Sequence, residues 1–133
     1  MTSTVEYKGN LRTEAIHIES GTKILTDAPK DNFGNGESFS PTDLLATSLS
    51  ACMLSIMGIV ARRDNIDISG IKTEVTKIMY SDPRRVGEIH VKIYMPITLN
   101  EKQRTILENA AHTCPVAKSL HPDITQKIEF IYS

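Results

Sequence analysis

The sequence predicts an α+β fold in which one long central helix packs against antiparallel sheets. Segments of alternating polar and apolar residues lie near both ends of the chain and in its middle, as in half-buried strands. Between them, the stretch from Leu44 to Ala61 is apolar on every side of a helix. With 133 residues, of which 40% are apolar, the chain suffices for one core, and we expect a single domain over residues 1–133.

The N-terminal part predicts three short strands and a loop. The expected strands are Thr4 to Lys8, Leu11 to Ile18 and Lys23 to Thr26. The first two are joined by Gly9-Asn10, a pair that is typical of a hairpin turn. Residues 27–39 contain Pro and Gly without periodicity and are expected to form a loop.

The start of the central helix is the strongest local signal. Ser40-Pro41-Thr42-Asp43 supplies an N-cap serine, a proline at the first helical position and an acid three residues after the cap. We expect the helix to end near Arg62-Arg63. A helix this apolar is either a membrane span or the buried axis of a globular fold. Its Ser, Thr and Gly residues lower its hydrophobicity, which favours the buried axis.

The rest of the chain predicts two long strands, two helices and a closing strand. The expected strands are Ile66 to Tyr80, Val86 to Ile97 and Thr125 to Tyr132, and the expected helices are Asn100 to about Ala111 and Val116 to Leu120. One sheet formed by so few residues cannot cover an all-apolar helix on every side, whereas a second copy of the chain can. We therefore expect a homodimer.

Composition argues against several classes of partner. A formal charge of -1 gives no broad electrostatic reason to bind nucleic acid or an anionic membrane, and without Trp there is little aromatic surface for base stacking. The N-terminus lacks a basic segment followed by an apolar one. We therefore expect a cytoplasmic protein whose two cysteines are kept reduced.

The two cysteines decide between a structural and a chemical function. Cys52 lies in the middle of the apolar helix, where a buried cysteine is most often a small apolar residue. Cys114 precedes Pro115, at a helix start where backbone N–H groups and the helix dipole lower a thiol pKa, and His112 can add positive charge. Taken singly, each cysteine leaves both alternatives open.

Other chemistry has weaker support. The spacing of the four histidines and two cysteines does not match a metal site, and there is no phosphate loop, dinucleotide fingerprint or nucleophile elbow, so we expect no cofactor. Arg12 follows the predicted hairpin. An arginine there is either a solvated edge residue or a guanidinium turned into a pocket, where it lowers a thiolate pKa.

Three segments together resemble the OsmC/Ohr family along nearly the whole chain. They are Tyr7-x-Gly9-x-x-Arg12, then Gly34-x-Gly36-x-x-x-Ser40-Pro41-Thr42-Asp43-Leu44-Leu45-Ala46 with Ser50-Ala51-Cys52, and Ala111-His112-Thr113-Cys114-Pro115-Val116-Ala117-Lys118-Ser119-Leu120. Each is weak alone, but their order on matching elements is specific. The resemblance implies an intertwined α+β homodimer, with two long helices buried between sheets and active sites at the subunit interface.

The resemblance also implies an activity, the reduction of organic hydroperoxides or hydrogen peroxide in stress defence. Cys52 would attack the O–O bond and become a sulfenic acid, and Cys114 would resolve it as a disulfide that an external dithiol reduces. Arg12 matches the arginine that activates the peroxidatic thiolate. The alternative is a non-catalytic OsmC-like dimer that binds a small hydrophobic ligand.

One departure points to a divergent branch. The better-characterised peroxidases carry a glutamate ten residues before the helix cysteine, where it holds the arginine, and that position is Thr42 here. Asp43 comes one residue late, points to the opposite side of the helix from Cys52 and fits the capping box. Glu37, in the preceding loop, is the candidate substitute.

Overall fold

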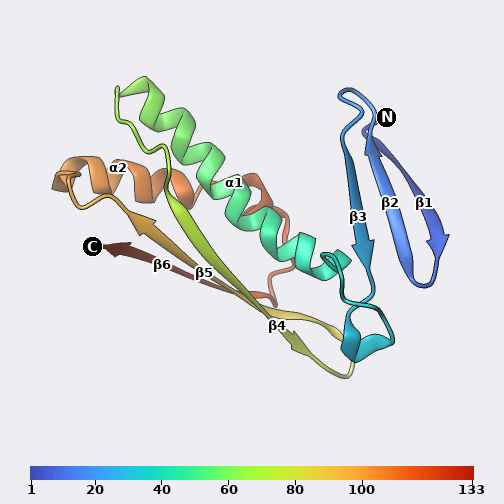
Figure 1. The fold of residues 1–133 in the computed structure, drawn as a ribbon. Coiled ribbons are helices and arrows are strands. Elements are labelled where there is room, and N and C mark those ends of the chain that lie inside the picture. The colour runs from blue at the N-terminus through green and yellow to red at the C-terminus, as the bar shows by residue number, and fades with distance from the viewer. The chain divides into compact units, whose positions relative to one another are not determined.

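The structure is a computed structural model that describes all residues, 1–133. The chain forms two compact units, Met1–Leu45 and Ala46–Ser133. Its elements are β1 (Ser3–Gly9), β2 (Arg12–His17), β3 (Lys23–Asp27), the 3-10 helix η1 (Lys30–Asn32), α1 (Pro41–Arg63), β4 (Lys72–Tyr80), β5 (Arg85–Met95), α2 (Glu101–Ala111), α3 (Pro115–Ser119) and β6 (Thr125–Tyr132) (Figure 1). The predicted order of elements is confirmed.

The first unit contains an antiparallel sheet with the order β1-β2-β3. Its first hairpin differs from the sequence prediction by one residue, because the turn is Asn10-Leu11 and Gly9 still pairs with Arg12. Both turn residues have positive φ, 54° and 63°, as a type I′ turn requires. The strand register shifts between Tyr7 and Gly9, which absorbs the extra residue in β1.

The predicted capping box at the start of α1 is confirmed. The Ser40 hydroxyl accepts the N–H of Asp43 (3.0 Å), and the Asp43 carboxylate accepts the N–H of Ser40 (2.9 Å). These bonds satisfy two of the backbone donors that a helix start leaves without partners. Asp43 is therefore occupied by the cap.

The second unit contains a mixed sheet with the order β4-β5-β6, and this corrects the expectation of antiparallel sheets throughout. β4 and β5 are antiparallel, whereas β6 runs parallel to β5 because α2 and α3 lie between them in the chain and return it to the same end of the sheet. β4 begins at Lys72 rather than Ile66. The N–H of Ser69 binds the Asp67 carboxylate and Gly70 has a φ of 87°, so residues 66–71 form a turn-rich connection.

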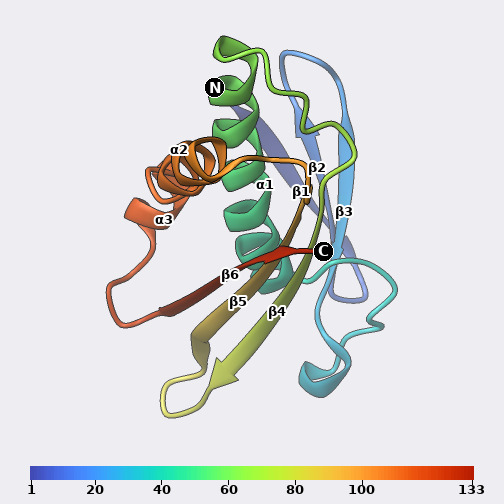
Figure 2. The ribbon, with the colours of Figure 1, turned by 90° about the vertical axis from the view of Figure 1, so that its left-hand side faces the viewer.

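Helices α1 and α2 lie on the same face of the β4-β5-β6 sheet (Figures 1 and 2). The core of the unit joins buried residues of α1, β5 and α2: Ala46, Leu49, Met53, Met57, Ala61, Ile89, Val91, Ile93, Met95, Leu107 and Ala111. In β5 these alternate with polar residues, which confirms the predicted face. Asn100 caps α2 in a second capping box, with Gln103.

The opposite side of α1 is not covered by the other elements of the second unit. Only 33% of its most apolar 18-residue window is buried, and Ile59 is 55% exposed. By length and composition α1 is long and apolar enough to cross a membrane, a test that core helices of globular proteins also pass. The second unit by itself thus leaves much of a long apolar helix uncovered.

The sheet face away from the helices carries a polar network centred on Glu88. Its carboxylate accepts hydrogen bonds from Tyr80 (2.6 Å) and from His90 Nε2 (2.8 Å), and Lys127 Nζ lies 3.4 Å away. These contacts, with the Tyr80 bond foremost, lower the pKa of Glu88 to about 2. They tie β5 to both neighbouring strands.

We expect Glu88 to make the stability of the protein depend on pH in the acid range. Its folded pKa of about 2 lies below the unfolded value near ~4.3, so its contribution is complete above pH ~4.3 and is lost as the pH falls toward 2. Urea midpoints of wild type and Glu88→Gln should therefore converge over that window. Glu129→Gln, which removes an exposed carboxylate from β6, is the control, and a wild-type advantage undiminished at pH 2 would contradict the assignment.

Candidate redox site

The two cysteines, 62 positions apart in the sequence, meet in the core of the second unit. Cys114 is fully buried at the start of α3, and Cys52 is half-buried on α1. Cys52 lies close enough to influence the pKa of the Cys114 thiol, and the Cys114 Sγ lies 4.0 Å from the carbonyl oxygen of Leu49. Both thiols are free. The structure thus brings together the pair that the sequence singled out.

The pKa of Cys114 differs from the sequence prediction. Burial raises it, the neighbouring Cys52 raises it further, and the backbone N–H groups of Ala117 and Val116 at the start of α3 oppose both effects without reversing them. The expected lowering at a helix start fails because a thiolate in this apolar core would lose its hydration. Cys114 is therefore held as a neutral thiol.

Arg12, in the first unit, is paired with Asp27, which lies directly opposite it across β2 and β3. Arg12 Nε donates to Asp27 Oδ1 (2.7 Å) and Nη2 donates to Oδ2 (2.9 Å), a bidentate contact to a carboxylate that is 1% exposed. The Arg12 bond lowers the pKa of Asp27 against the opposing effect of burial, and Asp27 raises the pKa of Arg12. Arg12 is thus not a solvated edge residue.

Glu37 is a second, looser partner of the same arginine. Arg12 Nη2 donates to Glu37 Oε2 at 3.3 Å, and the N–H of Glu37 donates to Asp27 Oδ2 at 3.1 Å. Two glycines let the loop reach this position: a Cβ on Gly34 would lie 1.6 Å from the carbonyl oxygen of Ala28, and Gly36 has a φ of 64°. The predicted contact between Glu37 and Arg12 is present, and the glycine spacing of the motif is explained.

The backbone of Leu11, next to Arg12, is held by hydrogen bonds at both its N–H and its carbonyl group. Leu11 adopts a φ of 63°, which is unfavourable for a residue with a Cβ. Its N–H donates to the Tyr7 hydroxyl (3.2 Å), and its carbonyl accepts the N–H of Ala28 (3.0 Å). These bonds hold the strained turn, and Tyr7 and Gly9 of the N-terminal motif serve this turn.

The other candidate residues have different surroundings. The Thr42 hydroxyl lies 3.2 Å from that of Ser40, within the helix cap. His112 packs edge-on against Phe130 with ring centroids 5.8 Å apart, and it is not among the groups that shift the pKa of Cys114. The support of the Cys114 thiol by His112 stays a prediction.

Sequence reasoning missed Asp27, which it placed in the loop after β3. The signal that would have found it is strand register: once the hairpin turns are fixed, Arg12 and Asp27 are cross-strand neighbours on one face. Opposite charges at such positions stabilise a sheet. Because the first hairpin turn was predicted one residue too early, the sequence analysis did not identify this pair.

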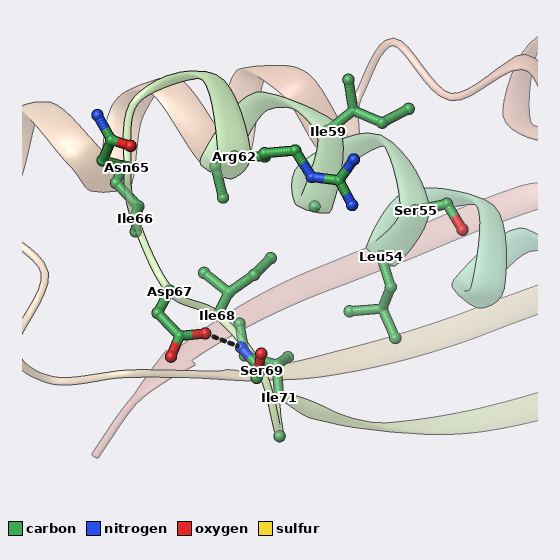
Figure 3. A pocket seen from close by; sticks show the side chains of 13 residues that line it. Leu54, Ser55, Ile59, Arg62, Asn65, Ile66, Asp67, Ile68, Ser69 and Ile71 are labelled. Carbon is green, nitrogen blue, oxygen red and sulfur yellow. Dashed lines mark hydrogen bonds between the residues drawn. The ribbon is translucent and has the colours of Figure 1, made fainter.

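A cavity of about 800 Å³ lies beside the C-terminal half of α1 (Figure 3). Leu54, Ser55, Ile59 and Arg62 line it from the helix, and residues 65–71 line it from the connection to β4. Neither cysteine lines it. No group of three or more His, Cys, Asp or Glu side chains in the chain is arranged to hold a metal ion.

The comparisons with known proteins concern the family and the fold. No curated protein matches the sequence. A Psychrobacter arcticus 273-4 protein assigned to osmotic stress induction and detoxification response is 58% identical, with a TM-score of 0.94 over 98% of this chain and 95% of that one.

More distant solved structures share the fold alone. A Legionella pneumophila organic hydroperoxide resistance protein OsmC has a TM-score of 0.71 at 20% identity, over 98% of this chain and 97% of that one. An OsmC-like protein of Mycoplasma pneumoniae has a TM-score of 0.80 at 19% identity, over 98% and 94%. The model of the family OsmC, described as OsmC-like protein, matches residues 34–129. These residues hold α1, both cysteines and almost all of the mixed sheet, and the chain belongs to the OsmC-like protein family.

Proposed function

We propose that the protein is a cysteine-based hydroperoxide reductase, and the observation that carries this proposal is that two free cysteines, Cys52 and Cys114, share one core. A peroxidase that works through a disulfide needs two reduced cysteines already within reach of each other. Some solved structures with this fold are named organic hydroperoxide resistance proteins, which agrees with this chemistry.

The proposed reaction has two steps on the protein. The Cys52 thiolate attacks one oxygen of the peroxide; the O–O bond breaks, an S–O bond forms, and the alkoxide leaves and takes a proton, giving a sulfenic acid and an alcohol or water. The Cys114 sulfur then attacks the Cys52 sulfur and expels water as the disulfide forms. An external dithiol supplies two electrons and two protons to restore both thiols.

Burial supports this division of roles. Cys52 is half-buried, whereas Cys114 has no exposed surface, so a peroxide reaches Cys52 first. We expected Cys114 to resolve because a loop-to-helix junction is mobile, and that reason is wrong because Cys114 lies in the packed core. The proximity of Cys52 replaces it, because resolution then needs only a short approach of the two sulfurs.

Arg12 is proposed to activate the Cys52 thiolate. A nearby guanidinium stabilises a thiolate electrostatically and donates hydrogen bonds to a peroxide oxygen. The support is the match of the Tyr7-x-Gly9-x-x-Arg12 segment to the family and the fixed geometry of the guanidinium. The proposed compartment is the cytoplasm, where dithiol donors keep both cysteines reduced.

The reaction is tested by counting thiols. After one equivalent of cumene hydroperoxide, the wild-type protein should lose two thiols per chain and gain an intramolecular Cys52–Cys114 disulfide, identified by mass spectrometry. The cavity beside α1 favours the alternative of a non-catalytic dimer that binds a small hydrophobic ligand. Such a protein would retain both thiols under these conditions, and that result would overturn the proposed reaction.

We further propose that the active form is a homodimer in which a second copy covers the exposed side of α1. Wild type should be a dimer by light scattering at low micromolar concentration. Ile59→Arg should weaken the dimer by on the order of 100-fold, because Ile59, exposed in the single chain, would be buried in each copy of the proposed dimer and the variant adds one charge per copy there. Asn109→Arg, on the exposed side of α2, is the matched control. A folded wild-type monomer would contradict the dimer.

A further inference from the structure

We propose that Asp27 is the residue that positions the Arg12 guanidinium for its reaction, and that Glu37 is a dispensable second partner. This inference rests on the proposed function of Arg12 and adds a residue that the sequence motif does not point to. Residue 42, ten positions before Cys52, is a threonine without a carboxylate, and the acids that bond Arg12 in the structure are Asp27 and Glu37.

The two carboxylates around Arg12 are not equivalent. Asp27 is 1% exposed, lies on a paired strand and accepts two bonds from the guanidinium in a fork-like geometry (2.7 and 2.9 Å). The Glu37 side chain is 69% exposed, lies on a loop and accepts one bond at 3.3 Å. A contact to a mobile, exposed side chain is screened by water and orients its partner poorly.

Asp27 is itself fixed by its neighbours. Its Oδ2 accepts the N–H of Glu37, its own N–H donates to the carbonyl of Phe39 (3.0 Å), and the adjacent Thr26 hydroxyl lies 2.5 Å from that of Thr13. The Asp27 backbone and one carboxylate oxygen are therefore held by bonds that do not involve Arg12. An acceptor held in this way fixes the orientation of the guanidinium that donates to it.

The bond pattern leaves one edge of the guanidinium available. Arg12 has five N–H donors; Nε donates to Asp27, and Nη2 donates to Asp27 and Glu37. The two N–H groups of Nη1 are not used by either carboxylate. Because Asp27 fixes the plane of the guanidinium through Nε and Nη2, it also fixes the direction of the Nη1 edge. That edge is the part suited to a thiolate or a peroxide oxygen.

Removing the charge of Asp27 and removing that of Glu37 should have opposite effects on the proposed reaction. Asp27 and Glu37 together outweigh the single positive charge of Arg12, so a thiolate or alkoxide nearby would be opposed by the surplus negative charge. Glu37→Gln removes that surplus and keeps the fork. Asp27→Asn removes charge too, but it replaces one acceptor oxygen by a donor that faces the guanidinium, and the fixed orientation is lost.

The orientation is tested without reference to activity by NMR of protein labelled with 15N-arginine. The Nε–H signal of Arg12, assigned by its absence from Arg12→Ala, should be protected from exchange in wild type and in Glu37→Gln. It should lose that protection in Asp27→Asn. Protection that survives in Asp27→Asn overturns the proposal, whatever the protein's activity.

The role of this orientation is tested by the rate at which peroxide oxidises Cys52. Asp27→Asn should be slower than wild type by about tenfold or more, since misplacing an activating group costs at least that much. Glu37→Gln should be at least as fast as wild type. Glu14→Gln, a carboxylate on the same strand as Arg12 without a bond to it, is the matched control and should be unchanged.

A double variant separates positioning from a merely structural effect. In the Arg12→Ala background, Asp27→Asn should cause no further loss of rate, because there is no guanidinium left to position. An equal loss in both backgrounds would mean that Asp27 acts through the stability of the sheet and would overturn the proposal. Should Asp27→Asn not fold by circular dichroism, Asp27→Glu decides: a shifted Nε–H signal with a wild-type rate overturns it.

The outcomes also separate this proposal from the proposed function. Loss of Nε–H protection in Asp27→Asn together with an unaltered rate in Arg12→Ala would remove Arg12 from the reaction and leave Asp27 as the residue that orients it. A slow Arg12→Ala variant beside a wild-type rate in Asp27→Asn would keep the function and reject the positioning role.

Discussion

Cys52→Ser is expected to abolish peroxide consumption, whereas Cys114→Ser should retain a single turnover. Cys52 is the cysteine with exposed surface, and a serine hydroxyl does not attack a peroxide at neutral pH. Cys114 is buried and held as a neutral thiol, so it meets no peroxide and acts only on an oxidised Cys52. Removing it leaves the first step intact and prevents the second.

Mass spectrometry after one equivalent of cumene hydroperoxide distinguishes the two variants. Cys114→Ser should show one added oxygen on Cys52, trapped by a sulfenic acid reagent, and further oxidation with excess peroxide. Cys52→Ser should stay unmodified, and Ser55→Ala, one helical turn further along α1, should behave as wild type. A Cys114→Ser protein with no oxidation at Cys52 would sink the peroxidase proposal in favour of ligand binding.

Arg12→Ala is expected to slow the alkylation of Cys52 by about tenfold at neutral pH. The variant loses the cation that the reaction proposal places beside the thiolate. It also leaves Asp27 buried without its partner, so some loss of stability is expected. We expect the loss of reactivity to exceed the loss of stability.

The measurement is the iodoacetamide rate against pH, with the urea midpoint determined in parallel. Lys8→Ala is the matched control, because Lys8 is a cation of the same sheet that forms an exposed pair with Glu6 (3.0 Å). Its profile should superimpose on that of wild type. An Arg12→Ala profile identical to wild type would remove Arg12 from the reaction.

Local rules were sufficient for most of the secondary structure. The Ser40 and Asn100 caps, the alternation in β5 and the all-apolar Leu44 to Ala61 segment are properties of a few consecutive residues, and the structure confirms each. The predictions were wrong where secondary structure depends on a longer segment. Residues 66–71 alternate as a strand does, but the Asp67 turn and Gly70 keep them out of the sheet.

The features of the candidate site also fall into those that the sequence predicts and those that only the tertiary structure decides. The types and order of the residues determined which cysteines and which arginine to consider, because a family motif is written in sequence. Strand register and burial were decided only by the tertiary structure. Arg12 and Asp27 are 15 positions apart and pair because β2 and β3 place them opposite each other.

The protonation of Cys114 shows the physical reason most directly. Its sequence neighbours predict a lowered pKa, since Pro115 starts a helix whose N–H groups favour a thiolate. Its spatial neighbours, the apolar core and Cys52, raise the pKa because they remove water from the sulfur and bring a second thiol to it. The sequence by itself determined the fold class, the family and the candidate redox pair; solvent exposure and contacts between distant residues, which tertiary packing sets, decided how each group is held.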